Sequence, residues 1–310
     1  MWAGFNAALP NEIVIQRPHL TAYTHALRLS GARLVEVGYL GYPGQGIVWP
    51  WQIEAAINEK TVALAYTVSS ARGAVSLEDF VNIGHRHGLR VIVDAAASLP
   101  PVSNLSRFIA CGADLVAFSG GKAIGGPQAT GILVGKRELI ESVALQHLDM
   151  DVSPATWTWR DRFLKSERMP GPPHHGLGRP MKVGKEGVVG LVTALRRFLE
   201  ADHVAERHTQ KQQLSTILDA LSGLPGLQMA HLSDDESPRP YPTAVLTLDE
   251  KVIGRPVEAI INELLQGDPP IAVSQNFLHE RAIGLIASSL VAGEELVLAS
   301  RLRALLSDRV

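Results

Sequence analysis

The chain has 310 residues, 46% of them hydrophobic, and a formal net charge of −2 at pH 7. This length suffices for one large domain and a smaller one, and the weak net charge does not favour nucleic acid or an anionic membrane as a partner. The one cysteine, Cys111, excludes an internal disulfide and indicates a reducing, cytoplasmic compartment, and no apolar run reaches the ~18 residues of a membrane span.

The first half of the chain alternates between strand-like and helix-like segments. Apolar strand-like runs lie at 12–16, 33–38, 61–68, 89–94, 114–118 and 129–135, with helix-like segments at 20–31, 50–60, 76–88, 104–112 and 136–148. Near-continuous apolar strands between amphipathic helices predict an α/β fold, in which helices cover both faces of a mostly parallel sheet. Ligands of such sheets bind at the carboxyl ends of the strands.

Regularity fails from 149 to 181, where "MPGPPHHGLGRP" indicates a loop. One long helix is expected at 185–223, then strands at 243–248 and 270–275 and helices at 256–267 and 293–308. We therefore expect a large domain over 1–180. The remainder, 181–310, is expected to form a linking helix and a smaller α+β domain.

Two ionisable residues follow neighbouring strands of the expected sheet. Asp94 ends the run "RVIVD", and Lys122 lies in the glycine-rich stretch "SGGKAIGG" after the next strand. A lysine amine forms a Schiff base with an aldehyde, and pyridoxal phosphate also needs a carboxylate for its ring nitrogen and donors for its phosphate. Ser119 and the backbone at Gly121 could supply such donors.

The spacing by itself leaves two interpretations equally open. In the other one, Asp94 caps a helix and Lys122 is a solvated loop lysine. A nucleotide-binding phosphate loop is excluded, since the pattern G-x-x-x-x-G-K-[ST] is absent from the "SGGKAIGG" stretch.

Longer stretches carry a more specific resemblance. The segments "VIVDAAASLPPVSNL", "GADLVAFSGGKAIGGPQATGILVGKRELI" and "GLGRPMKVGKEGVVGLVTAL" resemble the selenocysteine-synthase-like branch of the fold type I pyridoxal-phosphate enzymes. That branch includes L-seryl-tRNA(Sec) selenium transferase and D-glucosaminate-6-phosphate ammonia-lyase-like proteins. The similarity runs in order from about Glu12 to the C-terminus.

The resemblance implies a role for several residues. Lys122 would be the lysine that forms the Schiff base with the cofactor, and Asp94 would be the partner of the pyridinium nitrogen. Ser119 would bind the phosphate, and His19 would stack on the cofactor ring. For His19, a surface histidine near a helix start is the alternative.

Three further residues are candidates for contact with substrate or phosphate. Arg179 and Lys182 lie in "GRPMKVGKE", just before the long helix, and the family places cations there that can face a phosphate or a substrate carboxylate. Gln128, in "GGPQATG", is a candidate polar lining residue, or it shapes the loop. No metal site is expected, since His85 and His87 in "GHRHG" lack a third ligand and suit a helix C-terminus.

The chain departs from the family's pattern at its start. Members carry a further segment before the strand at 12–16, which includes a loop that holds the cofactor phosphate at a helix N-terminus. The sequence therefore suggests that this N-terminal segment is missing, which bears on cofactor affinity. A −2 chain without a basic cluster also argues against a tRNA substrate.

These observations together predict a pyridoxal-phosphate-dependent lyase. It would act on a small amino acid or amino-sugar acid by Schiff-base formation and α,β-elimination, with Lys122 as the general base. A pyridoxal-phosphate aminotransferase or racemase and a shortened, non-catalytic homologue are the alternatives. The resemblance further implies a homodimer or a higher homo-oligomer.

Overall fold

A computed structural model describes residues 9–40, 46–69, 71–148, 152–157, 171–172, 176–232 and 241–307. The chain forms two compact units, Met1–Glu200 and Ala201–Val310.

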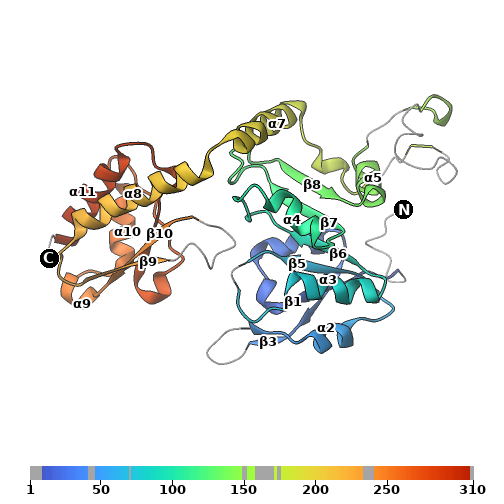
Figure 1. Ribbon diagram of the computed structural model, residues 1–310, viewed down its shortest axis with the longest axis horizontal. Helices are drawn as coiled ribbons and strands as arrows, with labels where there is room; N and C mark the ends of the chain where they lie inside the picture. The colour runs from blue at the N-terminus through green and yellow to red at the C-terminus, as the bar shows by residue number, and fades with distance from the viewer. Residues whose placement is uncertain are drawn as a thin grey trace. The chain divides into compact units, whose positions relative to one another are not determined.

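The first unit is built around one six-stranded sheet (Figure 1). Its strands are β1 (Glu12–Gln16), β2 (Arg33–Val37), β5 (Thr61–Thr67), β6 (Arg90–Asp94), β7 (Leu115–Ser119) and β8 (Gly131–Gly135). The order is β2-β1-β5-β6-β7-β8, and every neighbouring pair is parallel except β7 and β8. The predicted mostly parallel sheet is confirmed.

Successive side chains of a strand point to opposite faces of the sheet, so a central strand contributes side chains to a core on each face. Val14 of β1 belongs to a core that contains Leu64, whereas Ile13 and Ile15 belong to a separate cluster with Ala63. Two apolar layers on one strand require cover on both sides. The described helices of this unit are α1 (His25–Leu29), α2 (Pro50–Ala56), α3 (Leu77–Arg86), α4 (Asn104–Ala110), α5 (Arg137–His147) and α7 (Lys185–Glu200).

Local side-chain chemistry sets where two of these helices begin. The Ser76 hydroxyl accepts a hydrogen bond from the Asp79 amide at 3.1 Å and caps α3, as the S-x-x-D pattern predicts. At 20–31, the expected helix is replaced by a 3₁₀ turn, η3 (Ala22–Thr24), and the short α1. The side chains of Thr21 and Thr24 form a reciprocal cap on that turn, which delays the α-helix to His25.

The second unit has its own sheet and core. Its strands, β9 (Leu227–Leu232), β10 (Thr243–Leu248) and β11 (Ala282–Ile286), form an antiparallel sheet in the order β11-β10-β9. The helices packed with it are α8 (His203–Leu221), α9 (Glu250–Ile253), α10 (Val257–Gln266) and α11 (Glu294–Ser307). This unit is the expected smaller α+β part of the chain.

Two sequence-based predictions in the second half differ from the structure. The strand expected at 270–275 is reduced to one bridge between Ser274 and Gly284 of β11, because Pro270 at its start lacks an N–H. The helix expected at 185–223 is two helices. Asp202 interrupts it, since its carboxylate accepts hydrogen bonds from two amides at the start of α8.

The break also sets where the first unit ends. The sequence suggested a boundary after residue 180, whereas the compact unit continues to Glu200 and includes α7. The reason lies in α7 itself, whose Leu191, Ala194, Leu195 and Phe198 pack against the core of the first unit.

A buried carboxylate joins the starts of β6 and β7 to the residue that follows β8. The Asp114 side chain is 0% exposed and accepts from four donors: Lys136 Nζ at 2.6 Å, Val91 N at 2.7 Å, His85 Nε2 at 3.0 Å and Arg90 Nη1 at 3.3 Å. Burial alone would raise its pKa, but the hydrogen bonds outweigh burial and lower the pKa of Asp114 to about 2.

We therefore expect Asp114→Asn to lower the free energy of unfolding at pH 7 by about 2 kcal/mol. Because the folded pKa lies below the ordinary 3.8, the stabilisation is complete above about pH 4 and is lost as the pH falls towards 2. Urea unfolding at pH 7 and at pH 2.5 measures both quantities. Glu59→Gln, at an exposed acid, is the control, and an equal loss for Asp114→Asn at both pH values would contradict the assignment.

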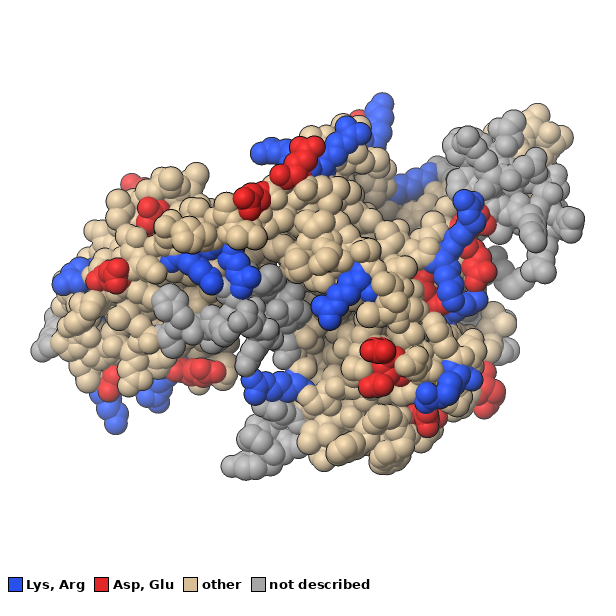
Figure 2. Space-filling model, in the orientation of Figure 1, with Lys and Arg blue, Asp and Glu red and all other residues tan. Residues whose placement is uncertain are grey.

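Charged side chains of both signs are interspersed on the face of the molecule drawn in Figure 2. Among the helices that the structure describes, none has both the length and the apolar character that a membrane span requires.

Candidate active site

The predicted cofactor residues lie at one edge of the main sheet. β1, β5, β6 and β7 run parallel, so their carboxyl ends share that edge. Asp94 is the last residue of β6 and Ser119 the last of β7. In the β6–β7 register, Asp94 lies opposite Ala117, two residues before Ser119. The topology therefore brings these two half-buried side chains to adjacent strand ends.

Hydrogen bonds to the side chain and the carbonyl of Asp94 hold it at the end of β6. Its Oδ1 accepts from the Ala96 amide at 2.9 Å, and its carbonyl accepts from the Val68 amide at 2.9 Å. Within the described part of the chain, Oδ2 has no hydrogen-bond partner. An anchored carboxylate with a free oxygen suits a protonated ring nitrogen as its ligand.

Lys122 is carried by a tight loop between β7 and β8. The Gly125 amide donates to the Lys122 carbonyl and the Gly126 amide to the Gly120 carbonyl, both at 2.8 Å. A Cβ on Gly121 would lie 2.6 Å from the Cα of Gln128, so only glycine permits that approach. The Lys122 side chain is exposed and forms no ion pair with any acid that the structure describes.

The segment after β1 supplies two aromatic contacts at the same edge. His19 is 2% exposed, and its ring meets the ring of Tyr66 edge-on, at 4.2 Å between centroids. Four residues later, the Tyr23 ring lies 5.3 Å from Lys122 Nζ, within cation–π range. This short segment thus links β5 to the Lys122 loop.

Burial makes His19 a neutral group. It lowers the pKa of His19 to about 4, so the imidazole is uncharged at neutral pH. Its buried Nδ1 has no hydrogen-bond partner among the described residues. A neutral, buried ring with an orphan nitrogen is suited to contact with a flat, polar ligand. The surface-histidine alternative is excluded by this burial.

The other three predicted residues are exposed and lie outside the strand ends of this edge. Gln128 is exposed and packs on Gly121 across the Lys122 loop. Arg179 lies in a 3₁₀ turn, η6 (Arg179–Met181), and Lys182 follows it; both side chains are exposed. Their contact with substrate or phosphate stays a prediction.

Two residues at this edge were not predicted from the sequence, Tyr23 and Tyr66. Tyr66 is the penultimate residue of β5, and its position near a carboxyl end was the available signal. Tyr23 gave none, because its contact with Lys122 joins residues almost 100 positions apart.

The residues present fit pyridoxal phosphate. Within the described ranges, the Lys122 amine has no acidic partner, Asp94 has a carboxylate oxygen without a hydrogen bond and the neutral His19 ring has an unpartnered nitrogen, and these groups match the aldehyde, the ring nitrogen and the ring face. Ala95, Ala96 and Ala97 follow Asp94 and leave room for a flat ring. No group of three potential metal ligands occurs among residues 9–307 outside the undescribed gaps.

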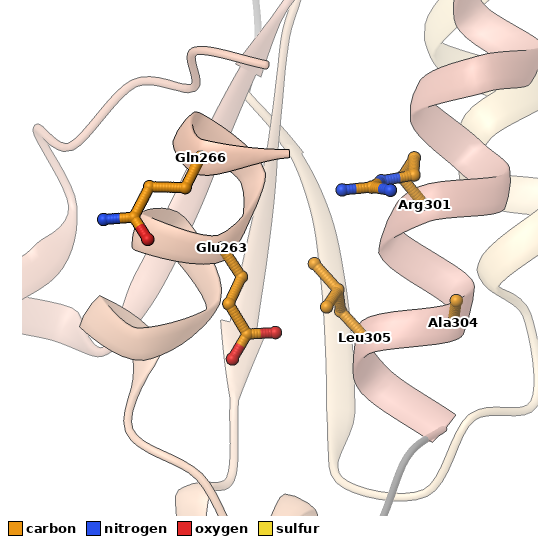
Figure 3. Close-up of a pocket in the computed structure, with 5 residues that line it drawn as sticks. All are labelled: Glu263, Gln266, Arg301, Ala304 and Leu305. Atoms are coloured by element: carbon orange, nitrogen blue, oxygen red, sulfur yellow. The ribbon is translucent and has the colours of Figure 1, made fainter. Parts of the chain in front are cut away.

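A separate cavity of about 400 Å³ lies in the second unit, between α10 and α11 (Figure 3). Its lining consists of Glu263, Gln266, Arg301, Ala304 and Leu305. None of the predicted cofactor residues lines it.

Known proteins resemble the chain over almost its whole length. A family model described as aminotransferase class-V matches residues 10–247. D-glucosaminate-6-phosphate ammonia lyase from Salmonella typhimurium is 30% identical over 305 residues, which cover 96% of this chain and 71% of that protein. L-seryl-tRNA(Sec) selenium transferase from Aquifex aeolicus is 27% identical, with 73% of this chain and 49% of that protein covered.

Solved structures agree. A structure of D-glucosaminate-6-phosphate ammonia-lyase has a TM-score of 0.69 and 29% identity, and covers 98% of this chain and 73% of its own. A cysteine desulfurase from Escherichia coli, at a TM-score of 0.57 and 18% identity, shares the fold over 100% of this chain and 75% of its own. The predicted fold class, family branch and cofactor are confirmed: the chain belongs to the class-V aminotransferase family and is a pyridoxal-phosphate-dependent enzyme of fold type I.

Proposed function

We propose that the chain is a lyase that removes ammonia from a small amino acid or an amino-sugar acid by α,β-elimination. The observation that carries the proposal is its 30% identity, over 96% of its length, to an ammonia lyase of an amino-sugar acid phosphate. The candidate site at the carboxyl edge of the sheet supports it.

Each predicted residue then has a role at that edge. Lys122 would hold the cofactor through its amine, and as a free amine it would take the proton from the substrate Cα. Asp94 Oδ2 is proposed to face the ring nitrogen and His19 the ring plane. Ser119 and the Gly121 amide are proposed as phosphate donors. The cofactor, when bound, supplies an electron sink for the negative charge that develops at Cα.

The net reaction balances without an oxidant. The Cα–H bond breaks as its proton passes to Lys122, and a β-hydroxyl leaves Cβ as water. Hydrolysis of the remaining C–N bond then consumes one water and releases ammonia and a 2-keto acid. Gln128, Arg179 and Lys182 are the proposed contacts for the substrate carboxylate or a terminal phosphate.

The test begins with the purified chain and added pyridoxal phosphate. A visible absorption band should form, and reduction with borohydride should fix the cofactor mass on the peptide that contains Lys122. The loaded protein is then assayed with 2-amino-3-hydroxy acids, with and without a terminal phosphate, for ammonia and keto acid. A trapped cofactor on another lysine would overturn the assignment.

The same assay separates the alternatives. Amino-group transfer to an added keto acid, without free ammonia, would indicate an aminotransferase, and loss of optical activity alone would indicate a racemase. A protein that stays colourless with excess cofactor would indicate a non-catalytic homologue.

We further propose a homo-oligomer in the cytoplasm. Val188, Val189 and Val192 expose apolar surface on one face of α7, which supports self-association. The lone Cys111 supports a reducing compartment. Sedimentation equilibrium and cell fractionation test the two proposals.

A further inference from the structure

One face of α7 packs closely against the loop that carries Lys122 (Figure 1). Leu191 Cδ1 lies 2.7 Å from where a Cβ on Gly120 would be, and 3.4 Å from that position on Gly126. The Pro127 ring comes within 2.8 Å of a Cβ built on Gly190. The loop and the helix therefore touch on both sides of Lys122 in the sequence.

Gly190 lies inside α7, where the backbone conformation does not require a glycine. Glycine is the poorest helix former after proline, and Gly190 lies well inside a sixteen-residue helix. Its φ is not in the left-handed region, so its backbone suits any residue. The close approach of Pro127 is the remaining explanation: an alanine methyl would overlap the proline ring.

Leu191 contacts the two glycines that close the Lys122 loop. The Gly126 amide donates to the Gly120 carbonyl at 2.8 Å, so these residues form the base of the loop. Leu191 also packs into the core of the first unit. It therefore connects the base of the loop to the packed core of the first unit.

We propose that Gly190 and Leu191 are positioning residues, which hold the Lys122 loop against α7 and so place the lysine amine at the carboxyl edge of the sheet. The inference rests on the proposed function of Lys122. It assigns to α7 a role that is separate from any contact with cofactor or substrate.

The cofactor affinity of Gly190→Ala distinguishes a purely helical role of Gly190 from a positioning role. If α7 were only a helix, alanine would raise its helix propensity and leave cofactor binding unchanged. If the contact between α7 and the loop positions Lys122, the added methyl displaces Pro127. The apparent affinity for pyridoxal phosphate, measured from the visible band, then falls about ten- to a hundred-fold. Thr193→Ala, at an exposed position of the same helix, is the matched control and should bind as wild type does.

A second readout needs no cofactor. Amide hydrogen exchange of the peptide spanning 120–130 should accelerate several-fold in cofactor-free Gly190→Ala and not in Thr193→Ala. Unchanged exchange together with unchanged affinity would overturn the inference. A wild-type protein that binds no cofactor would overturn the proposed function. The exchange result would still decide whether α7 holds the Lys122 loop in place.

Leu191 provides a second pair of variants should Gly190→Ala not fold. Leu191→Ala should loosen the loop and weaken cofactor binding, whereas Leu191→Met keeps the volume and should restore both exchange and affinity. Equal behaviour of the two variants would count against a positioning role.

Discussion

Lys122→Ala is expected to abolish the cofactor's visible band and the activity of the loaded protein. The substitution removes the amine that the cofactor aldehyde needs, and alanine cannot accept the proton from the substrate Cα. Loss of a positioned base alone typically costs about 10²- to 10⁴-fold in rate. Loss of covalent attachment adds to that cost. Absorption spectra with added pyridoxal phosphate and single-turnover rates measure the two effects.

The surroundings of Lys122 indicate that its replacement by alanine will not destabilise the fold. Lys122 is exposed and forms no ion pair with an acid in the described ranges, so its removal leaves no buried charge unpaired. Thermal unfolding should therefore change little. Lys251→Ala, at an exposed lysine of α9, controls for the loss of a surface charge. A visible band that survives in Lys122→Ala would require another lysine as the attachment site.

Asp94→Asn is expected to reduce turnover by about 10²- to 10³-fold, the usual effect of removing one preorganised electrostatic group. The amide oxygen can still accept from the Ala96 amide, so the strand end keeps its anchor. The amide cannot keep a ring nitrogen protonated, because it carries no negative charge. The cofactor should consequently bind more weakly and stabilise the developing negative charge less well.

Asp79→Asn is the matched control, since Asp79 is an exposed carboxylate in the first turn of α3. It should bind cofactor and turn over as wild type does. The spectrum of bound cofactor adds a readout that a purely structural effect would not change. Wild-type turnover in Asp94→Asn would remove Asp94 from the site.

Much of the first unit was predictable because its signals are local. The apolar runs at 12–16, 61–68 and 89–94 are strands, since a strand buried on both faces needs apolar side chains at successive positions. The end of such a run also marks the sheet edge where ligands bind. Asp94, Ser119 and Lys122 could therefore be selected from the sequence, and the motif around Lys122 indicated the cofactor.

Local signals were weakest where several weak preferences compete. The run at 270–275 has the composition of a strand, but only one bridge to β11 forms there, because Pro270 lacks an N–H and the Ile271 amide donates to the Leu264 carbonyl. The helical pattern at 185–223 continues through Asp202, whose capping hydrogen bonds interrupt it. Pairing partners and caps decided these cases.

The sequence by itself determined the chemical class of this protein. The spacing of Asp94 and Lys122 left two interpretations open, and the resemblance of the longer stretches around them to pyridoxal-phosphate enzymes decided between these. Only the tertiary structure decided what surrounds that stretch. Tyr23 beside Lys122, Tyr66 against His19 and Gly190 against Pro127 are contacts between distant parts of the chain. Such contacts depend on how the elements pack. The local sequence around one residue of a pair therefore does not identify the other.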